Sequence, residues 1–200
     1  MVLPQGVSVS EIVSEEQVVA AADGLFYELG VQAVGMDVIR DTAGVTLKRL
    51  YRLFPSKADL VTAVLEQRDL DVRQAVGDFV DARGGDSRAR ILSVFDYLSE
   101  WFTQPSFRGC IFINTVGELG GKYEAVQRIA RQHKLLLRDY LADLVADCAL
   151  PAGVADQLLI LANGAMSTAA ILGTPEAGRQ AREIAELLLS SRSAGNPIGG

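Results

Sequence analysis

Residues 42–58 read TAGVTLKRLYRLFPSKA, and this stretch decides the predicted fold. The Ala-Gly-Val triplet at 43–45 predicts a tight turn, because its glycine can adopt positive φ without a steric penalty. Thr46 belongs to the residue types that cap helices, so it predicts the start of a helix over 47–54. Pro55 lacks a backbone N–H and ends that helix. The stretch therefore predicts a turn that leads into a short, capped helix.

Cationic residues gather on this predicted helix, in a chain whose net charge is −6. Leu50 and Phe54 fall on one side of the helix at i and i+4, which predicts buried anchors. The cations spread over the rest of its surface, with no acidic residue among them; they are Lys48, Arg49, Arg52 and Lys57. A short helix with a cationic outer face and an apolar anchor is typical of a recognition helix in the major groove of DNA.

The same stretch resembles the amino-terminal helix-turn-helix of the TetR family of transcriptional repressors. That family has an Ala-Gly-Val-Ser turn followed by a Leu-Tyr pair, a phenylalanine and a Ser-Lys pair at fixed spacing. The matching residues here are Ile39, Ala43, Gly44, Val45, Thr46 in place of serine, Leu50, Tyr51, Phe54, Ser56, Lys57 and Leu60. The resemblance covers residues 14–65, and it departs from the family pattern at Arg40, Lys48 and Arg49.

Charge pattern and resemblance together predict double-stranded DNA as the partner of this helix. The predicted contact residues are Thr46, Leu47, Lys48, Arg49, Tyr51, Arg52 and Lys57. We expect Lys48 to contact a base edge. We expect Lys57 to hold a phosphate, because it lies in the first turn of the next helix, where backbone amides are unpaired. The alternative is a solvated cationic helix face.

The remaining sequence predicts helices only, so the predicted fold class is all-α. Ser14 and Gln17 form a capping box that starts a helix ending at Gly30. The other helices are predicted at 36–43, 57–82, 87–103, 109–118, 122–149, 154–172 and 175–190. The predicted division is a flexible arm at 1–13, a three-helix DNA-binding domain at 14–56, a helical ligand-binding and dimerisation domain at 57–189, and a disordered tail at 190–200.

Composition excludes several other classes of protein. With 49% apolar residues, a chain of 200 can bury a large core. Its two cysteines are too few for a disulfide framework or a metal cage, and His133 is the only histidine. Neither a phosphate-binding loop nor a catalytic triad is evident, so we predict no enzyme activity, cofactor or metal.

The ends and the apolar segments of the sequence bear on location. The start, MVLPQG, lacks the charged region and apolar core of a signal peptide. The apolar run at 154–172 is interrupted by Asp156, Gln157 and Asn163, so it predicts no membrane span. A reducing cytoplasm is the predicted location. Cys110 is interpreted as a small buried hydrophobe or a thiol sensor, and His133 as a surface or rim residue.

Aromatic residues concentrate between 95 and 123, where seven of the thirteen fall. Helical spacing allows a solid core, but polar residues lie on the same apolar segments, as in a small-molecule pocket. Members of the family that the chain resembles commonly sense small molecules in this part of the chain. The predicted pocket residues for a small apolar or aromatic effector are Phe95, Leu98, Trp101, Phe102, Phe107, Cys110, Asn114 and Glu118.

Small and apolar residues recur at 4-3-4 spacing along the last two predicted helices. Such a seam suits close packing, either inside the chain or against a second copy. Because two-fold dimers are the rule in the resembled family, the seam predicts a homodimer interface of Leu158, Ala162, Ala165, Ala169, Leu172, Ala181, Ile184 and Leu188.

These observations predict a homodimeric transcriptional repressor that binds a palindromic operator and is released by a small ligand. One alternative is a ligand-binding protein of the same fold that does not use its head on DNA. A helical-bundle enzyme is the third alternative. Salt-sensitive DNA affinity distinguishes the first function from the second, and turnover distinguishes the third.

Overall fold

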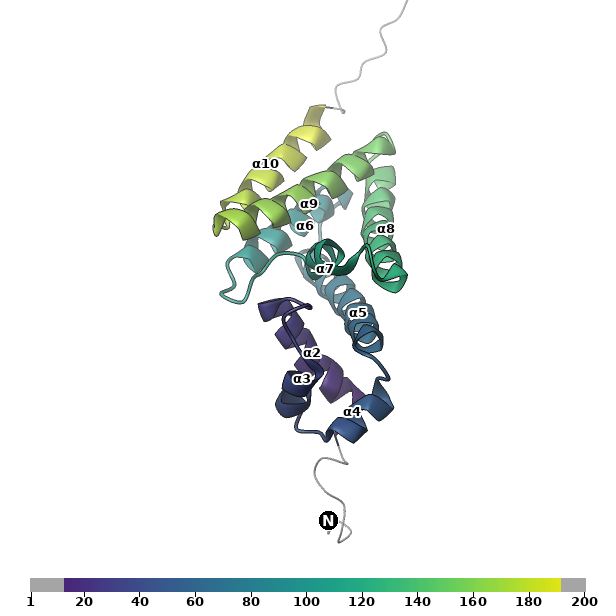
Figure 1. The fold of residues 1–200 in the computed structure, drawn as a ribbon. Helices are drawn as coiled ribbons and strands as arrows, with labels where there is room; N and C mark the ends of the chain where they lie inside the picture. Colours follow the sequence, from purple (N-terminus) through teal and green to yellow (C-terminus); the bar gives the residue numbers. More distant parts are fainter. Residues whose placement is uncertain (1–12, 192–200) are drawn as a thin grey trace, which may run out of the picture. The chain divides into compact units, whose positions relative to one another are not determined.

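The computed structural model describes residues 13–191 (Figure 1). This part of the chain forms nine helices and no strand, which confirms the all-α prediction. The helices are α2 (Glu15–Leu29), α3 (Met36–Ala43), α4 (Leu47–Leu53), α5 (Lys57–Arg83), α6 (Ser87–Phe102), α7 (Ile111–Leu119), α8 (Glu124–Asp147), α9 (Gly153–Leu172) and α10 (Glu176–Ser191). The predicted tail began at 190, but α10 continues to Ser191; the predicted arm up to residue 12 and the tail from 192 lie outside the described residues.

Helix ends follow the capping signals in the sequence. The Ser14 hydroxyl accepts a hydrogen bond from the Gln17 N–H at 3.3 Å, and the Gln17 side chain accepts one from the Ser14 N–H at 2.8 Å. These two bonds form the predicted capping box at the start of α2. Ser56 and Asp59 exchange the same kind of bonds at the start of α5.

Contacts divide the chain into two compact units. Within the described residues, the head unit contains residues 13–69 together with Ile111–Ala130, and the body unit contains Leu70–Cys110 and residues 131–191. Helices α5 and α8 therefore contribute to both. This grouping differs from the predicted boundary at residue 57, because the start of α5, α7 and the start of α8 belong to the same unit as α2, α3 and α4. Sequence spacing alone does not reveal such contacts between distant segments.

The head unit has its core where α2, α3, α4 and the start of α5 meet. The buried side chains there include Val18, Ala22, Phe26, Ile39, Leu50, Leu60, Val61 and Val64. A bidentate ion pair holds α5 against α2, because Arg68 donates to both carboxylate oxygens of Asp23. The distance from Arg68 Nε to Asp23 Oδ1 is 2.9 Å. The Arg68 guanidinium also lies 5.0 Å from the centre of the Tyr27 ring. These contacts fix the frame that carries α4.

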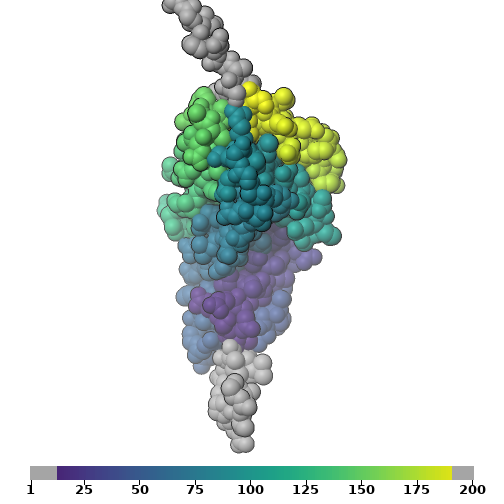
Figure 2. Space-filling view, turned by 180° about the vertical axis from the view of Figure 1, so that it is seen from behind, coloured from purple at the N-terminus to yellow at the C-terminus, as the bar shows by residue number. Residues whose placement is uncertain are grey.

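The body unit is built around α6, which packs against α9 and α10. Figure 2 shows α6 (teal) between α8 (green) and α10 (yellow). Close approach of α10 to α6 requires a glycine, because a Cβ added to Gly178 would lie 2.6 Å from the Ser99 hydroxyl oxygen. An ion pair between Arg182 and Asp96, at 2.7 Å, joins the same two helices.

Helix α9 is a core helix of the body unit. Within the described part of the chain it is the helix whose length and composition would also suit a membrane span. Its inward face is buried against α6 and α10, however, from Val154 at the start to Ala169 near the end. Packing of that kind is usual for the core helix of a bundle.

Candidate nucleic-acid interface

The turn before α4 has the geometry that its glycine predicts. Gly44 adopts φ 67° and ψ 30°, the left-handed conformation that ends α3. Its N–H donates to the Asp41 carbonyl at 3.3 Å, and the Val45 N–H donates to the Arg40 carbonyl at 3.1 Å. Arg40, a departure from the family pattern, forms an ion pair with Asp41 on the surface of α3.

Helix α4 is capped and anchored as predicted. The Thr46 hydroxyl accepts a hydrogen bond from the Arg49 N–H at 3.1 Å, which satisfies one unpaired donor of the first turn. Leu50 and Phe54 are buried in the head unit. With one side fixed in the core, the opposite side of α4 is held towards solvent.

Four of the predicted contact residues share this solvent side. Leu47 is 42% exposed and Tyr51 is 45% exposed, while Lys48 and Arg52 are also exposed. The two pairs are spaced i and i+4, so they form two adjacent rows on the helix. We call these four residues the outer face of α4. It joins two cations to an aromatic ring and an aliphatic side chain, beside the exposed Thr46.

The structure sets Arg49 and Lys57 apart from that face. Arg49 turns towards the segment before α2, where its Nη2 donates to the Val13 carbonyl at 3.4 Å. The Lys57 ammonium lies 6.0 Å from the centre of the Phe26 ring. Burial lowers the pKa of Lys57, and the nearby Glu118 carboxylate partly opposes that effect. The DNA roles of both cations stay predictions.

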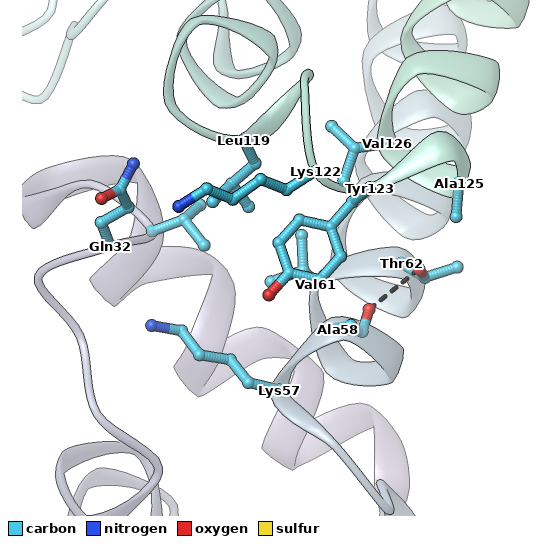
Figure 3. Close-up of a pocket in the computed structure, with 11 residues that line it drawn as sticks. Gln32, Lys57, Ala58, Val61, Thr62, Leu119, Lys122, Tyr123, Ala125 and Val126 are labelled. Atoms are coloured by element: carbon cyan, nitrogen blue, oxygen red, sulfur yellow. Dashed lines mark hydrogen bonds between the residues drawn. The ribbon is translucent and has the colours of Figure 1, made fainter.

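Lys57 also lines a pocket of about 240 Å³ that lies wholly within the head unit (Figure 3). We call it the head pocket. Its lining residues are Val31, Gln32, Lys57, Ala58, Val61, Thr62, Leu119, Lys122, Tyr123, Ala125 and Val126. None of the eight residues predicted for an effector pocket is among them. Tyr123 belongs to the cluster of aromatic residues noted in the sequence, but no local pattern indicated that Lys122 would line a pocket.

The eight predicted pocket residues are divided between the two units. Phe95, Leu98, Phe102 and Cys110 are buried in the body unit, and Trp101 and Phe107 are half-buried there. Rings pack against each other, with centroids 5.0 Å apart for Trp101 and Phe107 and 4.8 Å apart for Phe102 and Phe107.

The two polar members of that set belong to the head unit. Asn114 is exposed on α7. The Glu118 carboxylate accepts a hydrogen bond from the Gln32 N–H at 2.8 Å, so it ties α7 to the segment between α2 and α3. A ligand-binding role for the predicted set stays a prediction.

His133 was predicted to lie at the surface, and that prediction is wrong. Only 4% of the residue is exposed. It follows Val126, Ile129 and Ala130 at helical spacing, and all three are buried, so it continues the inward row of α8. Its polar sequence neighbours concealed this periodicity. Cys110 is buried as predicted, with its Sγ 3.5 Å from the Lys134 ammonium nitrogen.

The predicted dimer seam needs a correction as well. Five of its eight members are buried inside the body unit, where α9 and α10 pack against each other and against α6; they are Leu158, Ala162, Ala165, Ala169 and Ala181. Small residues mark this seam because they let the helices of one chain approach closely. Of the other three, Leu172 and Ile184 are exposed and Leu188 is half-buried.

Large apolar side chains are exposed on the opposite side of the same helices. Ile160 is 71% exposed, Ile171 82% and Leu187 68%. Together with Ile184 they form what we call the exposed apolar face of α9 and α10. Ile160, Ile171 and Leu187 were not among the residues predicted for the interface, although the spacing of Ile160 and Ile171 places both on one side of α9.

Comparisons with known proteins agree with the helix-turn-helix. The family model described as bacterial regulatory proteins, tetR family, matches residues 18–64. The HTH-type transcriptional activator FasR of Mycolicibacterium smegmatis is 41% identical over 87 residues. That match covers 41% of this chain and spans 39% of the length of FasR.

Two solved structures resemble the chain over most of its length. A TetR-family transcriptional regulator of Streptomyces coelicolor is 29% identical with a TM-score of 0.82, and the match covers 89% of this chain and 95% of that one. A TetR-type transcriptional regulator of Streptomyces avermitilis is 27% identical with a TM-score of 0.77, with coverage of 89% and 97%. These relatives are transcriptional regulators rather than enzymes.

Proposed function

We propose that the chain is a TetR-family transcriptional regulator that binds a specific DNA duplex through the outer face of α4. One observation carries the proposal. Lys48 and Arg52 are exposed beside Tyr51 on a short helix whose other side is anchored in the core. A helix of this kind fits the major groove, where lysine and arginine contact base edges and phosphates.

A selection of bound duplexes from a random DNA pool tests this function. We expect an enriched sequence, and we expect affinity for it to fall steeply with salt, because neutralised phosphates release counterions. Absence of any enriched duplex would contradict the proposal. It would favour a ligand-binding protein of the same fold that makes no use of its head on DNA, a function that the head pocket makes reasonable.

The proposed assembly is a homodimer formed through the exposed apolar face of α9 and α10. Large exposed apolar patches commonly mark protein interfaces, and family members are typically dimers. A two-fold dimer carries two copies of α4, so the selected duplex should be a palindrome with half-sites about one helical turn apart or a multiple of it. A motif without symmetry would count against this assembly.

The proposed mode of control is repression that a small apolar or aromatic effector releases. FasR, the relative with the highest identity given above, is described as an activator, so the direction of control needs its own test. The selected duplex can be placed over a reporter promoter in cells with and without this protein. Higher reporter expression without the protein supports repression, whereas lower expression shows activation.

An effector site is proposed beside the ring cluster of Trp101, Phe102 and Phe107 in the body unit. Trp101 is the only tryptophan of the chain, so its fluorescence reports on this cluster alone. A panel of aromatic compounds should be titrated while Trp101 emission and affinity for the selected duplex are followed together. A compound that changes both supports the site and the mechanism. If no compound changes the emission, the rings are core and the site proposal fails.

A further inference from the structure

The head pocket has an apolar wall and a cationic side. Val31, Val61 and Val126 contribute aliphatic surface from three separate segments of the head unit. Lys57 and Lys122 contribute two ammonium groups from the first residue of α5 and the turn before α8. Figure 3 shows both lysine side chains running towards the side of the pocket where Gln32 lies.

The polar groups of the pocket leave it suited to an anion. The Glu118 carboxylate, which acts on Lys57, already accepts the Gln32 N–H, and the Gln32 amide donates to the Glu118 carbonyl at 2.6 Å. The Thr62 hydroxyl donates its proton to the Ala58 carbonyl at 2.9 Å. The lining thus contains two ammonium groups and no carboxylate, and the Tyr123 hydroxyl adds a further donor to it.

Size and lining restrict the ligand further. A volume of about 240 Å³ lies below the range of roughly 300–1,000 Å³ that is usual for ligands of drug size. A nucleotide or a coenzyme thioester would exceed it, and inorganic phosphate would leave the aliphatic wall without a partner. An acid with one carboxylate and a short chain or single ring uses both the cations and the wall. We propose that the head pocket binds a small apolar monocarboxylate, and that this anion lowers the affinity of the protein for DNA.

The effect on DNA rests on the proposed function and follows from the position of Lys57. This residue lies four positions after Leu53, the last residue of α4, and Ser56 and Asp59 hold the start of its helix. A carboxylate that pairs with the Lys57 ammonium competes with the phosphate predicted for the same group. An allosteric or competitive coupling of this kind typically changes affinity by about 5- to 150-fold.

Calorimetry on the full chain tests the site itself. Benzoate and hexanoate are the probes, and benzamide and hexanamide are their uncharged counterparts. We expect Lys122→Gln to weaken benzoate binding about 5-fold, as for a partly solvated ion pair. Arg128→Gln is the matched control, because Arg128 is an exposed cation on α8 that does not line the pocket, and it should leave the affinity unchanged.

Two results would overturn the site: equal binding of the amides and the acids, or benzoate affinity that Lys122→Gln leaves unchanged. A second variant, Ala125→Phe, fills the pocket without removing charge. It should abolish binding of both acids, and retained binding would again count against the site. Circular dichroism of each variant shows whether the fold is kept.

The coupling is measured on the duplex chosen by selection. Without a carboxylate, Lys122→Gln should bind this duplex like the unmodified chain, because Lys122 lies outside α4. Saturating benzoate should lower the affinity of the unmodified chain at least 5-fold and that of Lys122→Gln less. If benzoate binds but leaves DNA affinity unchanged, the coupling is wrong and the site stands. If the chain selects no duplex at all, the proposed function fails, while calorimetry still decides the site.

Discussion

Helices α4 and α9 contain the two clearest patterns of predicted surface contacts in the sequence. Most of the contact residues predicted on α4 are exposed, whereas most of those predicted on α9 are buried. On α4, four residues predicted to make contacts are exposed and the predicted anchors are buried. On α9, four of the five predicted contact residues, Leu158, Ala162, Ala165 and Ala169, are buried within the protomer, and only Leu172 at the end of the helix is exposed. The exposed apolar face lies on the other side of that helix.

The physical content of the two patterns explains this difference. A cation without a partner must face water, because burial of an unpaired charge is far too unfavourable. Charge therefore indicates the direction of the α4 side chains as well as their period. Small residues at 4-3-4 spacing indicate that a helix packs closely, but they do not identify its partner. The partner on α9 is the rest of the body unit.

Substitution of Ala169 by glutamate should have the largest effect, because it tests whether the small-residue seam is internal. Ala169 is buried between helices, so an unpaired carboxylate there should lower the free energy of unfolding by about 4 kcal/mol or more. Ala170→Glu places the same side chain one residue on, at an exposed position, and should change stability by only about 0.5 kcal/mol. Urea denaturation of both variants measures the difference; similar stabilities would mean that the seam faces outwards.

The exposed apolar face provides the next test, in which association should be lost while the fold is kept. Ile160→Glu combined with Leu187→Glu places two carboxylates on surface that the proposed dimer buries. We expect folded monomers by light scattering, with an unchanged circular dichroism spectrum. Gln132→Glu adds the same side chain to an exposed position of α8 and should remain a dimer. A double variant that is still dimeric would move the interface away from this face.

The helices and their ends could be predicted from the sequence because the signals are local. Ser14, Thr46 and Gly44 act on neighbours within four residues, and each has the predicted geometry. The head pocket could not be predicted in this way. It needs Gln32 and Lys122 side by side with Lys57, and only the tertiary fold brings these distant segments together. The burial of His133 is an intermediate case. Its helical spacing from the apolar residues of α8 was a local signal, but the charged and polar residues next to it in the sequence obscured that signal.

Substitution of Lys48 by alanine should have a smaller effect, which should be confined to the affinity for DNA. Removal of a good base contact costs about 1–3 kcal/mol of binding free energy. We therefore expect Lys48→Ala to bind the selected duplex about 5- to 150-fold more weakly and to discriminate less at one base pair. Arg131→Ala removes an exposed cation of the body unit and should leave the affinity nearly unchanged. Fluorescence anisotropy at several salt concentrations measures both variants. If both variants lose the same affinity for DNA, Lys48 contributes only non-specific positive charge and no base contact.

The smallest effect should come from the cap of α4, compared with a cap that has no part in DNA binding. Thr46 accepts the Arg49 N–H at 3.1 Å, and Asp86 accepts the Ala89 N–H at 2.9 Å at the start of α6. Replacement of either residue by alanine should lower stability by about 1 kcal/mol, because each leaves one amide of a first turn without its partner. Thermal denaturation should therefore hardly distinguish the two variants. DNA affinity should distinguish them, because only Thr46→Ala frays the turn that holds Lys48 on the outer face. If Asp86→Ala weakens DNA binding as much as Thr46→Ala does, the loss of affinity comes from general destabilisation. That result would contradict a specific role of the α4 cap in DNA binding.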